Sequence, residues 1–225
     1  MKPDLVQNFS NLQVRIISAF FIGLLFITAI FFIRPLFFLL ILIIAAIMLA
    51  EWYEMTHSKR IYLYSGLMII SIPISSLLYI SEIDYNGWLL ATFFIIIWSV
   101  DSFAMFIGKW LQGPKLAPIL SPKKTISGLV GGITAAIFFP LLLRLIPSYK
   151  IPYYGHISDF ILIGQFGVLA IVAQVSDLFI SYFKRKFKIK DSGNIIPGHG
   201  GMLDRFDSII LTAPIVAFYL HSQIE

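Results

Sequence analysis

The chain has 225 residues, of which 58% are hydrophobic and only 13% are charged, and it has no cysteine. Soluble domains average about 45–50% apolar and about 25% charged residues, so this composition excludes an ordinary soluble domain and also a disordered chain. The lack of cysteine excludes disulfides, thiolate metal sites and thiol chemistry. We therefore expect an all-α polytopic integral membrane protein, folded as one compact helical bundle.

Apolar runs along the chain predict about seven transmembrane helices. A bilayer core about 30 Å thick needs about 20 helical residues, and these runs lack the alternating polarity of barrel strands. The expected helices lie near residues 14–33, 35–54, 61–80, 87–107, 127–147, 158–182 and 206–222.

The basic residues predict the orientation of the bundle. With a cytoplasmic N-terminus, 14 of the 17 Lys and Arg residues fall in inside segments, and only Arg34, Arg144 and Lys150 fall outside. Cytoplasmic segments carry an excess of basic residues, so this orientation is favoured over the reverse. The two long polar loops, residues 108–126 and 183–205, then share the cytoplasmic face. Basic residues that act as topology signals and anion ligands give no reason to expect nucleic acid as a partner.

Two aspartates stand inside predicted spanning helices, Asp101 in FFIIIWSVDSFAMFIGK and Asp177 in GVLAIVAQVSDLFISYFKRK. A carboxylate at this depth is costly, so it normally faces a cavity, a metal ion or a partner charge. Ser181 and Lys184 follow Asp177 by four and seven residues, which places all three on one helix face. The alternative is a buried, hydrogen-bonded structural aspartate.

A basic run from Lys184 to Asp191 leads into the loop Pro197-Gly198-His199-Gly200-Gly201. The run alone fits a positive-inside signal or a contact with anionic headgroups. The glycines of the loop permit close backbone approach, so N–H groups can face phosphate oxygens.

Asp204 and Asp207 follow the glycine loop, three residues apart, and therefore share a helical face. They suit a helix N-terminus as capping residues. Together with Asp177 they also suit a hard cation such as Mg²⁺, which favours oxygen ligands.

The segment from Leu120 to Gly128 is a third candidate site. Ser121-Pro122 starts a turn, and Ser121 or Thr125 can cap the next helix. Lys123 and Lys124 beside a helix N-terminus suit a phosphate group, while an ordinary basic loop is the alternative. The three segments together predict phosphate chemistry at a membrane surface, with lysines on phosphates and carboxylates on a metal.

The stretch from Ser181 to Asp207 resembles the signature of the phosphatidate cytidylyltransferase (CDP-diacylglycerol synthase) family. The shared pattern is Ser-x-apolar-Lys-Arg, then Lys-Asp after four intervening residues, then Pro-x-His-Gly-Gly-apolar-x-Asp-Arg-apolar-Asp. Residues from Asp101 to Gly128 are also similar to the family, so the resemblance covers roughly residues 98–210. The chain departs from the family at Ser176 and Ile180, where the family often has glycine and glutamate.

The resemblance implies a nucleotidyltransferase of phospholipid biosynthesis, which transfers CMP from CTP to phosphatidic acid and releases pyrophosphate. It implies Mg²⁺, with a second cation as a further expectation, a homodimer, and a bacterial inner membrane with the active site on the cytoplasmic side. It divides the one membrane domain into N-terminal helices over residues 1–97 and a catalytic region over residues 98–225.

The resemblance also assigns site residues. The metal ligands are expected to be Asp177, Asp207 and then Asp204. The catalytic set is Asp177, Lys184, Arg185, Asp204, Asp207 and His199. The substrate-binding set is Ser121, Lys123, Lys124, Thr125, Ser181, Lys190, Asp191, Gly200, Gly201, Arg205 and Asp101.

Three alternatives stay open at the level of the sequence. One is a CTP-dependent enzyme similar to polyprenol kinases. Another is a small membrane transporter or proton relay that uses Asp101 and Asp177. The last is a membrane scaffold or an inactive relative of the family.

Overall fold

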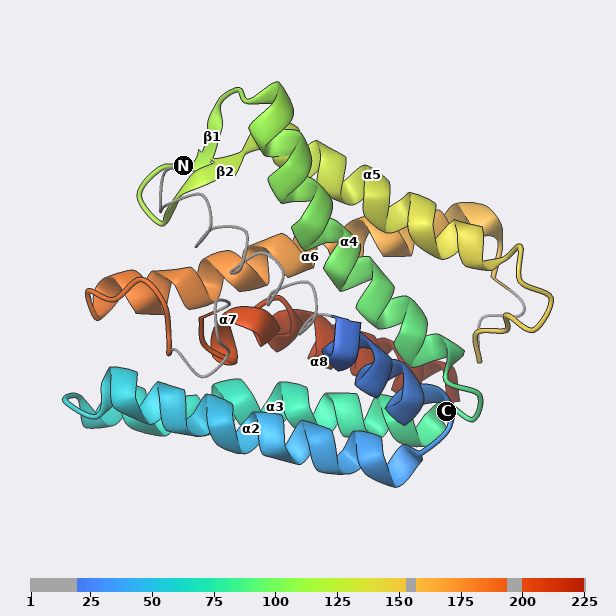
Figure 1. The fold of residues 1–225 in the computed structure, drawn as a ribbon, viewed down its shortest axis with the longest axis horizontal. Coiled ribbons are helices and arrows are strands. Elements are labelled where there is room, and N and C mark those ends of the chain that lie inside the picture. Colours follow the sequence, from blue (N-terminus) through green and yellow to red (C-terminus); the bar gives the residue numbers. More distant parts are fainter. Residues whose placement is uncertain (1–19, 153–156, 194–199, 225) are drawn as a thin grey trace, which may run out of the picture.

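The computed structural model describes residues 20–152, 157–193 and 200–224 (Figure 1). A helix over Phe20–Phe31 comes first. It is followed by α2 (Arg34–Thr56), α3 (Arg60–Ile83), α4 (Trp88–Leu111), α5 (Ile126–Leu143), α6 (Asp159–Lys186), α7 (Leu203–Phe206) and α8 (Ile209–Ile224). Between α4 and α5, β1 (Lys115–Ala117) and β2 (Ser121–Thr125) form an antiparallel hairpin. The predicted all-α class is confirmed, and this hairpin is a small addition to it.

The expected apolar helices are found, but their lengths differ. Five helices, α2 to α6, are long and apolar enough to cross a membrane. Within the described residues, the helices over Phe20–Phe31 and Ile209–Ile224 are shorter, so the span count of seven stays a prediction. Residues 14–19 of the first expected helix lie outside the described residues. The last expected helix, residues 206–222, is not continuous, because a turn at Asp207–Ser208 separates α7 from α8. The side chain of Ser176 on α6 binds the Asp207 carbonyl oxygen and Leu211 N there, in place of a helix hydrogen bond.

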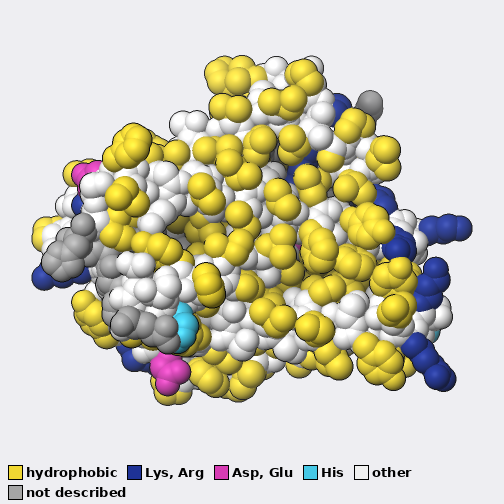
Figure 2. All heavy atoms as spheres, turned by 180° about the vertical axis from the view of Figure 1, so that it is seen from behind, with side chains coloured by type: hydrophobic (Ala, Val, Ile, Leu, Met, Phe, Trp, Pro, Cys, Tyr) yellow, Lys and Arg dark blue, Asp and Glu magenta, His cyan; other side chains and the backbone are white. Residues whose placement is uncertain are grey.

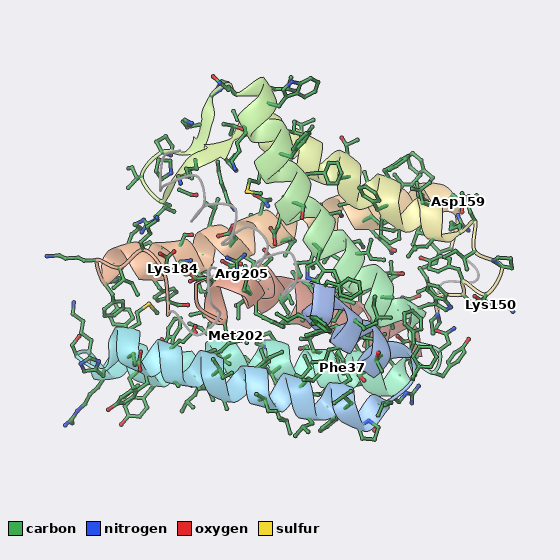
Figure 3. The ribbon with its side chains drawn as sticks, in the orientation of Figure 1. Phe37, Lys150, Asp159, Lys184, Met202 and Arg205 are labelled. Carbon is green, nitrogen blue, oxygen red and sulfur yellow. The ribbon has the colours of Figure 1, made fainter. Side chains whose placement is uncertain are left out.

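The helices are arranged in three groups (Figure 1). The pair α2 and α3 lies along one side, α4 and α5 pack closely against each other on the opposite side, and α6 and α8 lie between them. The core is apolar and aromatic. Phe37 on α2 is fully buried, and its ring lies 6.4 Å from that of Phe94 on α4 (Figure 3).

Glycines let α4 and α5 approach at their crossing. A Cβ atom on Gly128 would lie 2.5 Å from the carbonyl oxygen of Ala104, and one on Gly132 would lie 3.0 Å from that of Val100. At the start of α5 the side chain of Thr125 accepts a hydrogen bond from Gly128 N at 3.1 Å. Of the two predicted caps, Ser121 and Thr125, the structure therefore has Thr125, which fixes the direction in which β2 enters α5.

The outer surface is that of a membrane protein. Hydrophobic side chains cover the middle of the molecule, and Lys and Arg side chains gather toward its ends (Figure 2). Phe160, Leu145 and Phe218 are each more than 75% exposed. Exposure of so much apolar surface to water is unusual for a small soluble protein. Lipid tails accept such a surface, so the chain is an integral membrane protein.

The two long loops lie at the same end of the bundle. Arg185 at the end of α6 donates from Nε to the carbonyl oxygen of Leu120 in the hairpin turn, at 3.2 Å. Lys150 and Asp159 lie at the opposite end (Figure 3). The predicted sharing of one face is therefore confirmed, although both loops are shorter than expected, since α4 continues to Leu111 and α6 to Lys186.

Candidate active site

An ion pair joins the hairpin to the middle of α6. Lys124 Nζ on β2 lies 2.5 Å from Asp177 Oδ2 and donates to Gln174 Oε1 at 3.0 Å, one turn earlier on the helix. Ser181 donates from Oγ to Asp177 Oδ1 at 3.2 Å. The predicted shared face of Asp177 and Ser181 is therefore confirmed. Gln174, which is 4% exposed, was not among the predicted site residues, because a lone glutamine in an apolar helix gives little signal.

A second ionic cluster joins the end of α6 to α7. Lys184 Nζ lies 2.6 Å from Asp204 Oδ1 and 3.9 Å from Asp207 Oδ2. All three side chains are at least 90% buried. The expectation that Asp204 and Asp207 face the same way is confirmed, because both reach one lysine ammonium. Figure 3 shows Lys184 and Arg205 in this region, where α6 meets α7.

The surroundings of Asp204 favour its charged form. Burial alone would raise the pKa of Asp204, but the Lys184 ammonium and the backbone N–H groups of Ser192 and Gly201 outweigh burial and hold that pKa below its ordinary value. Asp204 therefore stays ionised at neutral pH, and its ion pair with Lys184 persists.

Asp101 lies on the α4 side of the same region. Ser208 Oγ lies 3.3 Å from each of its carboxylate oxygens. Asp101 and Asp207 both interact electrostatically with Asp177 and with Lys124. The three carboxylates repel one another, so a cation among them would lower the electrostatic energy.

Serines hold the turn between α7 and α8. Ser176 on α6 donates to the carbonyl oxygen of Asp207 and accepts from Leu211 N at 3.1 Å. These bonds satisfy backbone groups that a continuous helix would pair internally. They also place Asp207 next to α6, so the serine that replaces the family's usual glycine has a clear structural role.

The loop between α6 and α7 is fixed at both ends by carboxylates. Asp204 Oδ2 accepts from Ser192 N at 2.9 Å and from Gly201 N at 3.2 Å. Glu51 on α2, which is 2% exposed, accepts further hydrogen bonds from the same loop. Gly200 has a φ of 82°, a conformation that favours glycine.

Glu51 was not among the predicted site residues, although it lies within the expected helix over residues 35–54. Its spacing does carry a signal. The buried residues Phe37, Ile41, Ile44, Met48, Glu51 and Met55 recur every three or four positions along α2. Glu51 therefore continues the inward stripe of the helix, whereas Glu54 is exposed.

The remaining predicted residues lie around this centre or outside the described residues. Lys123, Arg185, Lys190, Asp191 and Arg205 are exposed. Ser121 is half-buried, and Thr125 is buried as the cap of α5. His199 lies outside the described residues. The structure thus brings together Asp101, Lys124, Asp177, Ser181, Lys184, Asp204 and Asp207. Their roles in substrate binding and catalysis stay predictions.

The predicted metal site is not formed as a set of close ligands. Within residues 20–152, 157–193 and 200–224, no three His, Asp or Glu side chains gather as ligands for an ion. The donor set nevertheless suits a hard cation, because the carboxylates of Asp101, Asp177, Asp204 and Asp207 outnumber the cationic groups of Lys124, Lys184 and Arg205 that act on them.

The arrangement of buried lysines and carboxylates under a basic surface suits a phosphate-containing substrate. The model of the cytidylyltransferase family matches residues 56–223. The chain belongs to this family. A phosphatidate cytidylyltransferase of Rickettsia bellii is 56% identical over 209 residues, which cover 93% of this chain and 90% of the relative. The one of Rickettsia felis is 52% identical over 217 residues, 96% of each chain.

A more distant relative matches the chain over a shorter stretch. The phosphatidate cytidylyltransferase of Bacillus subtilis is 43% identical over 126 residues, 56% of this chain and 45% of that relative. These findings confirm the predicted family and an enzyme of the nucleotidyltransferase class. They also argue against the transporter and scaffold alternatives. The match of this cytidylyltransferase to its family model begins at Thr56, so Glu51 lies before the matched region.

Proposed function

We propose that this cytidylyltransferase transfers CMP from CTP to phosphatidic acid, giving CDP-diacylglycerol and pyrophosphate. The observation that carries the proposal is the ionic cluster of Lys124, Asp177, Lys184, Asp204 and Asp207, which lies among apolar helices. The charged side chains would bind the phosphates of a nucleotide, and the apolar helices would contact the acyl chains of a lipid. The printed names of the Rickettsia relatives, phosphatidate cytidylyltransferase, support the same reaction.

The reaction needs positioning and charge stabilisation more than acid–base chemistry. A phosphate oxygen of phosphatidic acid attacks the α-phosphorus of CTP, and a new P–O bond forms. The bond from the α-phosphorus to the oxygen of the β-phosphate breaks, and the electron pair leaves with pyrophosphate. The attacking phosphate is already ionised, so the step needs no strong base and no covalent enzyme intermediate.

The lysines of the cluster are the groups that would meet the phosphates. Lys124 and Lys184 are paired with carboxylates, which keeps their buried charges neutralised. A bound triphosphate offers both lysines new anionic partners. Lys123 and Arg185, on the exposed rim, add attraction for the nucleotide and the lipid headgroup.

A divalent cation, with Mg²⁺ as the first choice, completes the proposed site. Asp177 and Asp207 would hold it, with Asp204 next. The oxygens of all three carboxylates already have protein partners, which the cation would displace. When bound, the cation neutralises charge on the triphosphate and on the departing pyrophosphate. Excess negative charge at the cluster supports this assignment.

The same proposal places the enzyme in a bacterial inner membrane with its site facing the cytoplasm, where CTP is available. The excess of basic residues at that end supports this orientation. We also propose a homodimer, on the strength of the family resemblance alone.

The test is product formation by the purified protein in detergent. The protein is incubated with labelled CTP, phosphatidic acid and Mg²⁺, and label in the lipid phase and released pyrophosphate are measured. We expect labelled CDP-diacylglycerol, lost without phosphatidic acid and in Asp207→Asn. No product from folded protein, with several divalent cations tried, would overturn the proposed function.

A further inference from the structure

A buried carboxylate in the N-terminal half contacts the signature loop. Glu51 lies on α2 and is 2% exposed, among apolar residues of the helix core. The proposed reaction assigns it no role. Since a carboxylate removed from water needs partners, the groups that bind Glu51 indicate what it does.

Glu51 holds both ends of one loop. At the first end, Ser192 Oγ donates to Glu51 Oε2 at 2.7 Å. At the second end, Met202 N donates to Oε1 at 2.7 Å and Leu203 N donates to Oε2 at 2.9 Å. Donors from both ends of the loop, Ser192 at one end and Met202 and Leu203 ten or more positions later, therefore converge on one carboxylate. Such charge-assisted bonds are stronger than neutral ones.

The backbone is shaped closely around this carboxylate. A Cβ atom on Gly201 would lie 2.6 Å from Glu51 Oε2, and one on Gly193 would lie 2.8 Å from Oε1. Both glycines are thus needed for the loop to approach Glu51 as it does. The close fit shows that the backbone of this loop is shaped to contact Glu51.

The same loop segment carries groups of the proposed site. Ser192 and Gly201 also donate from their backbone nitrogens to Asp204, whose other oxygen pairs with Lys184. Two carboxylates from different helices, Glu51 of α2 and Asp204 of α7, therefore bind the same loop segment. Without Glu51 the ends of the loop would be free to move. Asp204, which binds the same segment, would then shift relative to α6.

We infer that Glu51 is a positioning residue for CMP transfer, which acts by holding the ends of the 192–203 loop against α2. The inference rests on the proposed function, because it assigns Glu51 to that reaction. Glu51 itself touches loop groups and no reacting atom. Small displacements of supporting groups can lower the rate of an enzyme by about 10- to 100-fold.

The experiment compares Glu51→Gln with Glu54→Gln in the full chain. The two variants make the same change on the same helix, but Glu54 is exposed. Turnover is measured per folded protein with CTP and phosphatidic acid, and hydrogen exchange is measured on the peptide that contains Met202 and Leu203. For Glu51→Gln we expect kcat to fall about tenfold or more, the KM for CTP to change less than about threefold, and exchange at these amides to accelerate. Glu54→Gln should behave as the wild type.

Two further variants keep the test decisive if Glu51→Gln does not fold. Ser192→Ala removes one donor, and Glu51→Asp keeps the charge but shortens the side chain; both should lower kcat and loosen the same peptide by smaller amounts. Full turnover in a variant whose amides exchange faster would overturn the inference, as would a loss of kcat with unchanged exchange. Failure of the proposed function is a separate result, since the wild type would then make no product while the exchange difference would remain.

Discussion

The ammonium of Lys124, on β2, lies 2.5 Å from Asp177 Oδ2, in the middle of α6. The pair links the two halves of the site, because Lys124 belongs to the hairpin between α4 and α5 and Asp177 to the helix that ends at the signature loop. Neither group is more than 22% exposed. In a poorly solvated position each charge stabilises the other, so substrate or metal must replace these partners rather than simply add to them.

The first prediction concerns Asp177→Asn. The substitution removes the negative charge that Lys124 faces and one of the two first-choice cation ligands. We expect turnover to fall by about 100-fold or more. Asp159→Asn is the control, because Asp159 is 67% exposed and pairs with Arg144 at the opposite end of the bundle. Equal turnover in the two variants would show that Asp177 has no part in the reaction.

The second prediction concerns the stability that Lys184 provides. Lys184→Met leaves Asp204 and Asp207 buried without their ammonium partner. Breaking a buried pair in this way typically costs about 3–5 kcal/mol, so we expect a clearly lower unfolding temperature in detergent. Lys186→Met, on the exposed face of the same helix, removes a contact with the Tyr62 ring and should change stability by no more than about 1 kcal/mol. Equally small losses of stability in both variants would contradict the conclusion that Lys184 neutralises buried charges of Asp204 and Asp207.

The third prediction tests the crossing of α4 and α5. In Gly128→Ala the new methyl group would meet the carbonyl oxygen of Ala104 at 2.5 Å, so the helices must separate. Overpacking of this kind typically costs about 1–3 kcal/mol, and the displaced hairpin should also weaken turnover through Lys124. Gly164→Ala is the control, since nothing lies within 4 Å of its added atom. Gly164→Ala should match or exceed the wild type in thermal stability. If it lost as much stability as Gly128→Ala, the close packing of α4 and α5 would not explain the effect of Gly128→Ala.

The fourth prediction concerns the cation. Removal of divalent metal with a chelator should abolish turnover, and Mg²⁺ should restore it. Asp207→Asn should raise the Mg²⁺ concentration needed for half-maximal turnover by about tenfold or more, because a ligand is lost. In a magnesium titration Asp159→Asn should overlay the wild type. Turnover that persists in the chelator would contradict the assignment of a metal to the carboxylates.

Local features of the site could be predicted from the sequence. Helical spacing placed Ser181 beside Asp177 and turned Asp204 and Asp207 toward the same partner, because such neighbours are fixed by the geometry of one short segment. Residue type limited the cap of α5 to Ser121 or Thr125, and the structure has Thr125. The motif from Ser181 to Asp207 then indicated the family, since its residue types occur at fixed spacing.

Features that depend on contacts between distant segments could not be predicted. A single sequence does not reveal that Lys124 reaches Asp177 or that Glu51 reaches the 192–203 loop. The β1–β2 hairpin was expected as a loop, because its strands are short and β2 is polar. The break between α7 and α8 depends on Ser176 of another helix, so the apolar run by itself predicted one continuous helix.

The most direct measurement follows two phosphorus atoms of CTP through the reaction. The purified protein is incubated with phosphatidic acid and Mg²⁺ in two tubes, one with CTP labelled at the α-phosphorus and one with CTP labelled at the γ-phosphorus. Transfer of CMP predicts α-label in the lipid phase and γ-label in released pyrophosphate. Lipid that carries the γ-label would instead show a CTP-dependent kinase, and this result would contradict the proposed function.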